Sequence, residues 1–119
     1  MSTGELGAFG EKKAANHLRL HGYKIIDTNC RYRQGEIDIV AQKRGYIVFV
    51  EVKLRKNSRY GEAREFVTPA KQQRVITAAQ LWLQQHETDK QPRFDVIEVY
   101  APEGINTRKV MINHIENAF

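Results

Sequence analysis

The fold is decided by one stretch, GEIDIVAQKRGYIVFVEVK (residues 35–53), which has the pattern of two β-strands around a short turn. Valine, isoleucine and phenylalanine dominate both halves, as they do in strands that pack against a core. The same stretch carries Glu36, Asp38 and Glu51, followed by Lys53. Acids are costly to bury, so their presence in the most hydrophobic segment of the chain calls for a physical explanation.

Side chains point alternately to the two faces of a strand, which sorts this stretch into an apolar face and a charged face. The apolar face holds Ile37, Ile39, Ala41, Val48, Val50 and Val52. The charged face holds Glu36, Asp38, Val40, Ile47, Phe49, Glu51 and Lys53. We expect the apolar face to pack against the core. The large apolar side chains among the charges indicate that the second face is also partly covered.

The length of the turn determines which charged residues lie opposite one another. A two-residue turn at residues 44–45, or a four-residue loop around it, pairs Asp38 with Glu51. The same register pairs Glu36 with Lys53. Directly opposed Cβ atoms are about 5 Å apart, where two carboxylates repel by on the order of 3 kcal/mol at an effective dielectric of about 20. Either one carboxylate takes up a proton, or a cation lies between them.

We interpret the acid pair as a binding site for Mg²⁺ or Mn²⁺, since these ions prefer oxygen ligands. The alternative is an exposed hairpin face with solvated charges, or a surface Glu–Lys pair, which is the usual context of an isolated E-x-K. Ile47 and Phe49 lie on the same face as the acids. They argue against full exposure and favour the metal interpretation.

The whole chain predicts one domain over residues 1–119, with an α/β fold in the order helix, three strands, helix, two strands. Ser2 and Glu5 form a capping-box pattern for the first helix. Thr68 and Pro69 form the N-cap and first position of the second helix. The expected helices are 4–21 and 69–88, the strands 23–29, 36–42, 46–54, 93–100 and 109–116, and the basic loops 30–35 and 55–67. The predicted architecture is a mixed sheet of about five strands flanked by helices.

Composition narrows the class of protein. The formal net charge is +5 and the sequence pI is near 9.5, which favours a polyanionic partner, nucleic acid first, although many small soluble proteins are this basic for solubility alone. Cys30 is the only cysteine, so no internal disulfide forms, which suits a reducing cytoplasm. No apolar run is long enough to span a bilayer. We therefore expect a cytoplasmic protein with no membrane partner.

Two further charged residues occupy packing faces of the expected helices. On a helical wheel, Glu11 falls beside Ala14 and Ala15. Alone it is better explained as an acid that reaches water from the edge of the interface, but beside an acidic sheet face it becomes a candidate third carboxylate. Lys71 lies in the first turn of the second helix, where backbone N–H groups favour anions such as a scissile phosphate. The alternative is a lysine whose stem covers the edge of the core.

Three other titratable residues are placed outside the expected site. His17 and His21 have the i, i+4 spacing of a zinc site, but no third ligand is apparent, so a solvated helical pair is the better interpretation. Asp95 belongs to an expected strand near the acid pair. Its neighbours fit a core strand with a polar edge, and we therefore leave it out of the metal shell.

Together these residues resemble the PD-(D/E)XK nuclease superfamily, with Asp38 as the second-strand acid and residues 51–53 as the E-x-K. Ile37 stands where the superfamily's name has proline. More closely, nearly the whole chain resembles the bacterial YraN family of endonuclease-like proteins. The motifs that carry this likeness are G-x-x-G-E-x-x-A at 7–14, GEIDIVA at 35–41, VFVEVK at 48–53, Lys71 with Arg74, and FDVIEV at 94–99.

The resemblance implies a restriction-endonuclease-like fold and a metal-dependent endonuclease. Archaeal Holliday junction resolvases are similar in layout, and by that likeness four positions match their active site: Glu11, Asp38, Glu51 and Lys53. Asp38 and Glu51 would bind Mg²⁺ or Mn²⁺ together with the Val52 carbonyl. Lys53 would orient the attacking water or stabilise the transition state. Glu11 would complete the metal shell through water or position the nucleophile.

The expected partner is DNA, with branched or junction DNA as one candidate, and the resolvase likeness allows a homodimer. Phosphate contacts are expected from Arg31, Arg33, Arg55, Lys56, Arg59, Lys71 and Arg74. Tyr32 and Tyr60 could stack on bases or anchor loops against the sheet. Glu36 is either a further acid of the site or a structural partner of Lys53. The rival functions are a nucleic-acid-binding protein that does no cutting, and a protein whose basic loops recruit an acidic partner.

Overall fold

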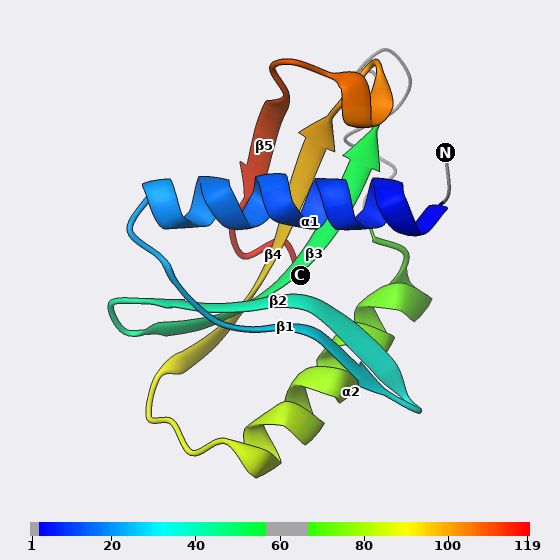
Figure 1. Ribbon diagram of the computed structural model, residues 1–119. Coiled ribbons are helices and arrows are strands. Elements are labelled where there is room, and N and C mark those ends of the chain that lie inside the picture. The colour runs from blue at the N-terminus through cyan, green and yellow to red at the C-terminus, as the bar shows by residue number, and fades with distance from the viewer. Residues whose placement is uncertain (1–2, 57–66) are drawn as a thin grey trace.

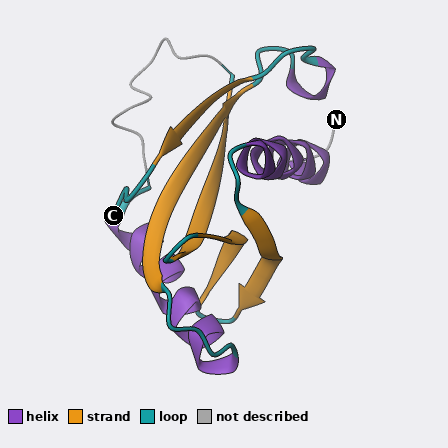
Figure 2. Ribbon diagram, turned by 90° about the vertical axis from the view of Figure 1, so that its left-hand side faces the viewer, coloured by secondary structure: helices purple, strands orange, loops and turns teal. Residues whose placement is uncertain are grey.

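The computed structural model describes residues 3–56 and 67–119 and confirms the predicted α/β fold, in which one mixed sheet lies between two helices (Figures 1 and 2). The elements are α1 (Thr3–Leu20), β1 (Lys24–Tyr32), β2 (Gly35–Lys43), β3 (Tyr46–Arg55), α2 (Pro69–Gln85), β4 (Gln91–Tyr100), the 3₁₀ turn η1 (Gly104–Asn106) and β5 (Met111–Ile115). Ser2 of the capping-box pattern and residues 57–66 of the second predicted loop lie outside the described residues. No helix in the described ranges is long and apolar enough to cross a membrane.

The sheet has the strand order β1-β2-β3-β4-β5. Neighbouring strands are antiparallel except for β3 and β4, which are parallel. A parallel pair requires a long crossover, and the connection that contains α2 provides it. The first turn of α2 is capped as predicted, because Thr68 Oγ1 accepts a hydrogen bond from the backbone N of Lys71 at 3.2 Å.

The hairpin of β2 and β3 has the register predicted from its turn. The two strands are joined by residues 44–45, and their backbone pairing ends with Ile39 opposite Val50. One step further in the same register leads to Asp38 on β2 and Glu51 on β3. The two acids therefore reach the same level of the sheet from neighbouring strands.

Two apolar clusters, one on each face of the sheet, hold the layers together. The cluster under α1 contains Ala14, Ala15, Leu18, Tyr23, Ile39, Ala41, Val48, Val50, Ile97 and Val99. The cluster under α2 contains Cys30, Ile37, Val40, Ile47, Phe49, Ala78, Ala79 and Trp82. The charged face of the predicted hairpin is thus covered by α2 over much of its length, which excludes the solvated-face alternative there.

The predicted apolar face is wrong at Ile37, which packs in the cluster under α2 instead of the cluster under α1. The reason lies in the neighbouring strand β1. Thr28 pairs with Ile39 and Cys30 pairs with Ile37. Asn29 between them has a positive φ of 50°. Beyond this backbone irregularity, Cys30 and its partner Ile37 both pack in the cluster under α2.

Two predicted boundaries are also wrong. β1 continues to Tyr32, so Arg31 and Tyr32 belong to the edge strand and not to a basic loop. α2 ends at Gln85, about a turn earlier than expected, because His86 has the extended backbone conformation φ −137°, ψ 105°. The first difference moves residues expected in a loop into a strand, and the second leaves residues 86–88 outside the helix.

Candidate functional site

β2 and β3 separate at the level of Asp38, whose side chain bridges the gap between them. Beyond the last backbone pair, Asp38 Oδ2 accepts a hydrogen bond from the backbone N of Val52 at 2.8 Å. The carboxylate therefore takes the place of a backbone partner and is held at the edge of β3. Because the N–H and C=O of one residue point to the same side of an extended strand, the Val52 carbonyl faces the same gap.

Glu51, on β3 beside this gap, is buried but incompletely paired. The residue is only 4% exposed. Its Oε2 lies 3.8 Å from Lys53 Nζ and 3.7 Å from Lys71 Nζ. Its Oε1 has no hydrogen-bond partner within the described part of the chain. A buried polar atom left unpaired costs on the order of 1–3 kcal/mol, so Oε1 needs a partner, which either a proton shared with Asp38 or a bound cation can supply.

Burial raises the pKa of both acids. For Glu51, burial and the neighbouring Asp38 carboxylate raise the pKa to about 7, against the opposing effect of Lys71 and Lys53. For Asp38, burial also raises the pKa, while the hydrogen bond from Val52 and the charge of Lys71 oppose it. The pair therefore retains a proton as the pH approaches neutrality, as expected of two neighbouring carboxylates with insufficient counter-charge.

The available donor atoms fit a hard divalent cation. Mg²⁺ and Mn²⁺ prefer carboxylate and carbonyl oxygens, which Asp38, Glu51 and Val52 offer at one gap in the sheet. A cation there would also give Glu51 Oε1 the partner it lacks. In residues 3–56 and 67–119, no three His, Cys, Asp or Glu side chains gather into one metal-binding group. The remaining ligands would have to come from the backbone, from water or from a substrate.

Glu11 reaches the same region from α1. It lines a cleft of about 540 Å³ whose residues are Gly4, Gly7, Ala8, Glu11, Asn29, Arg31 and Asp38. Burial raises the pKa of Glu11, a hydrogen bond from Asn29 opposes this, and the nearby Asp38 raises it further. The structure thus brings Glu11 and Asp38 to one cleft. Asn29 was missed from the sequence, where its only signal was a residue type that tolerates positive φ.

Glu36 has partners other than the predicted one. Its Oε1 lies 3.4 Å from Lys71 Nζ, and its Oε2 lies 3.3 Å from Arg31 Nη1. Lys53, which was expected to face Glu36, instead lies near Glu51. The predicted pairing assumed that the hairpin register continues, but the strands separate before these residues are reached.

The basic residues expected to bind phosphates fall into two groups. Four of them are exposed: Arg31, Arg33, Lys56 and Arg74. Arg31 also lines the cleft of Glu11, with 73% of its side chain exposed. Lys71, the fifth, is partly buried against the acids. Tyr32 packs against the cluster under α2, which supports the anchoring alternative for this tyrosine.

Arg55 does not belong with the exposed basic residues. Its Nε donates to the buried carboxylate of Glu98 at 3.3 Å, and only 18% of its side chain is exposed. It serves as a counter-ion inside the fold, a role that the loop expected from residue 55 onward did not predict. Arg59 and Tyr60 lie outside the described residues.

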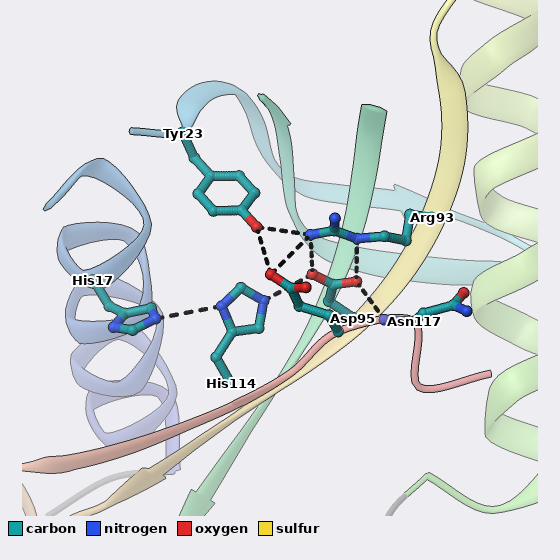
Figure 3. A network of polar contacts seen from close by, with 7 residues as sticks. His17, Tyr23, Arg93, Asp95, His114 and Asn117 are labelled. Carbon is teal, nitrogen blue, oxygen red and sulfur yellow. Dashed lines mark hydrogen bonds and ion pairs between the residues drawn. The ribbon is translucent and has the colours of Figure 1, made fainter. Parts of the chain in front are cut away.

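A second polar network lies on the α1 side of the sheet (Figure 3). Asp95 accepts hydrogen bonds from Arg93, and His114 Nε2 lies 2.7 Å from its Oδ2. His17 Nε2 lies 3.3 Å from His114 Nδ1, so His17 is not part of a solvated helical pair. Tyr23 extends the network, because its hydroxyl accepts from Arg93 at 2.7 Å. These contacts pair Asp95 with Arg93 and His114 inside the fold.

The comparisons with known proteins cover nearly the whole chain. The profile of the uncharacterised protein family UPF0102 matches residues 10–99. A UPF0102 protein of Symbiobacterium thermophilum is 46% identical over 116 residues, which are 96% of this chain and 95% of the relative. One from Caldanaerobacter subterraneus is 45% identical over 116 residues, 96% and 93% of the two chains. A UPF0102 protein of Clostridioides difficile is 43% identical over 120 residues, the full length of both.

Proposed function

The chain belongs to the uncharacterised protein family UPF0102, the YraN family that its motifs resemble, and we propose that it is a divalent-metal-dependent endonuclease acting on DNA. The observation that carries the proposal is the gap between β2 and β3. There Asp38 and the buried, half-paired Glu51 present oxygen atoms beside two lysines. Buried titratable groups with strongly shifted pKa values gather at functional sites more often than elsewhere.

Each residue of the gap has a distinct role in this proposal. Asp38, Glu51 and the Val52 carbonyl would hold Mg²⁺ or Mn²⁺, which would polarise the scissile phosphate and lower the pKa of an attacking water. Lys53, 3.8 Å from Glu51, orients that water or stabilises the charge that develops on the phosphate. Glu11 positions water from the cleft on the α1 side.

The surface beside the gap supports a nucleic acid substrate. Arg31 lines the cleft that contains Glu11 and Asp38, and Arg33 follows it in an exposed turn. Arg74 is exposed on α2. Together with the net charge of +5, these side chains would neutralise phosphates on either side of the acids.

The test is cleavage of a panel of branched and linear DNAs with Mg²⁺ or Mn²⁺ by the wild type, Asp38→Ala and Glu51→Ala. We expect each substitution to reduce the rate by about a thousandfold or more, since several kcal/mol of charge stabilisation are lost. Glu87→Ala, which removes an exposed acid beyond the end of α2, is the matched control and should cleave like the wild type. Cleavage that survives both substitutions would remove this active site. Salt-dependent DNA binding without cleavage by the wild type would select the non-catalytic alternative.

A further inference from the structure

Lys71 is the residue in the gap whose position the proposed chemistry does not explain. Its ammonium lies between two carboxylates, 3.4 Å from Glu36 Oε1 and 3.7 Å from Glu51 Oε2. Lys53 approaches the same Glu51 Oε2. Both ammonium groups therefore crowd one oxygen of Glu51, while Oε1 has no hydrogen-bond partner in residues 3–56 and 67–119.

The backbone of Lys71 is fixed, so its approach to the acids is not an accident of a loose helix end. Thr68 Oγ1 accepts from the backbone N of Lys71. Gln72 Nε2 donates to the Val67 carbonyl at 3.0 Å. α2 also packs directly on β2 at Gly35. A Cβ added to Gly35 would lie 2.1 Å from the backbone carbonyl oxygen of Arg74 in α2. Only glycine permits this approach, and it brings the first turns of α2 onto the acidic strand.

We propose that Lys71 is an internal cation that competes with the divalent metal for Glu51 and thereby sets the metal concentration at which the site is loaded. This inference rests on the proposed metal-dependent function. The ammonium and a divalent cation seek the same carboxylate, and their like charges oppose simultaneous binding. Glu36 is the second carboxylate within reach of Lys71, because its Oε1 lies 3.4 Å from the ammonium.

When the metal displaces Lys71 from Glu51, its ammonium can remain at the N-terminal end of α2. Lys71 extends from the first turn of α2, where free backbone N–H groups favour anions. An ammonium moved away from Glu51 by the metal remains beside Glu36 at this helix end. There it can pair with a substrate phosphate. Lys53 differs because it is tied to the same strand as Glu51, two positions along the same face.

The test measures Mn²⁺ binding by calorimetry, without DNA. We expect Lys71→Met to bind Mn²⁺ about tenfold more tightly than the wild type, as removal of a unit charge about 6 Å from a divalent ion predicts even at the dielectric of water. Lys71→Arg keeps the charge and should bind within about twofold of the wild type. Lys12→Met removes an exposed lysine of α1 and is the control for net charge, with an expected change below about twofold.

Glu36→Gln sharpens the test through a double-mutant cycle. If Glu36 shares Lys71 with Glu51, the substitution should weaken Mn²⁺ binding more in the wild type than in the Lys71→Met background. Equal effects in both backgrounds would contradict the shared lysine.

The outcomes separate the two proposals. If the wild type binds Mn²⁺ but Lys71→Met binds it no more tightly than Lys12→Met, the competing role of Lys71 is overturned and the metal site stands. If neither the wild type nor Lys71→Met takes up Mn²⁺ at millimolar concentration, the metal site itself fails, and the role of Lys71 fails with it. Urea unfolding of each variant establishes that the fold is retained.

Discussion

The two faces of the sheet each contain a buried acid, and they differ in how completely that acid is paired. Asp95 on the α1 side is fully buried, with Arg93 Nε and Nη2 at 2.9 and 2.8 Å, His114 Nε2 at 2.7 Å and the backbone N of Asn117 at 3.0 Å (Figure 3). Glu51 at the gap is almost as buried, yet one of its oxygens has no hydrogen-bond partner in the described part of the chain.

The pKa values of the two acids move in opposite directions for this reason. Burial alone raises the pKa of any carboxyl. At Asp95, burial acts in that sense, but the hydrogen bonds from His114, Arg93 and Asn117 overcome it and lower the pKa. At Glu51, the lysines do not offset burial and the Asp38 charge, so the pKa rises. Two carboxyls buried to a similar extent therefore have opposite pKa shifts, according to how fully each is hydrogen-bonded.

The largest expected effect is on the paired acid. Asp95→Ala should lower the free energy of unfolding by about 3–5 kcal/mol, because it leaves the Arg93 guanidinium partly buried and without its main partner. Urea denaturation followed by circular dichroism measures the loss. Asp89→Ala removes an exposed aspartate in the turn before β4 and should change stability by less than about 0.5 kcal/mol. A loss below about 1 kcal/mol for Asp95→Ala would mean that the network is not a structural unit.

The next largest effect is a loss of folding stability with rising pH, which originates at Glu51. Its folded pKa of about 7 lies above the unfolded value of 4.5, so the folded state binds the proton more tightly. The resulting stability is present below pH 4.5 and is lost as the pH rises to about 7. The loss is on the order of 3 kcal/mol, at about 1.4 kcal/mol per pKa unit. Urea unfolding at pH 5 and pH 8 should show Glu51→Gln nearly equal to the wild type at pH 5 and more stable at pH 8. A difference that is the same at both pH values would contradict the raised pKa.

A smaller effect on folding stability is expected from a divalent metal. It should depend on Glu51 at the gap and not on the Asp95 network. At pH 8 and Mg²⁺ tenfold above its dissociation constant, the wild type should gain about 1.4 kcal/mol of stability. Glu51→Gln should gain far less, because the gap has lost a charged ligand. His114→Gln disturbs the other network and should leave the gain unchanged. Thermal unfolding with Mg²⁺ and with an equal ionic strength of NaCl measures the difference. An equal gain in Glu51→Gln would place the bound metal elsewhere.

Sequence patterns a few residues long correctly predicted the helix start and the hairpin register. Thr68 and Pro69 marked the start of α2, and the two-residue turn at 44–45 set the register that brings Asp38 level with Glu51. These features depend on backbone geometry within a few residues. The approach of Glu11 to Asp38 was indicated by resemblance, since a helical wheel alone favoured a solvent-reaching acid.

Contacts between segments that are far apart in the chain could not be predicted from the sequence. Arg55 pairs with Glu98, and His17 with His114, across 43 and 97 residues of chain. No local pattern connects such partners. Ile37 leaves its predicted face and packs beside Cys30 of the neighbouring strand, a contact that alternation along β2 does not include. Strict alternation is therefore least reliable next to the site, where the strands separate.

The smallest predicted effect lies at the outer end of the Asp95 network. His17 Nε2 shares a hydrogen bond with His114 Nδ1, a contact worth about 1 kcal/mol. Burial lowers the pKa of His17, and the neighbouring His21 and His114 lower it further. The stability from the neutral ring is therefore present above the unfolded pKa of 6.5 and is lost as the pH falls through the lower folded value.

This slope is opposite to that of Glu51 in a neighbouring pH range, so the two partly cancel in the wild type and single variants separate them. His17→Phe should lower stability at pH 8 by about 1 kcal/mol and should lose less than the wild type on acidification to pH 5. Leu20→Ala, at an exposed side chain of the same helix, is the control and should leave the pH dependence unchanged. Urea unfolding at the two pH values is sufficient. If His17→Phe is weakened by acid as steeply as the wild type, His17 is not the group that makes this network sensitive to pH.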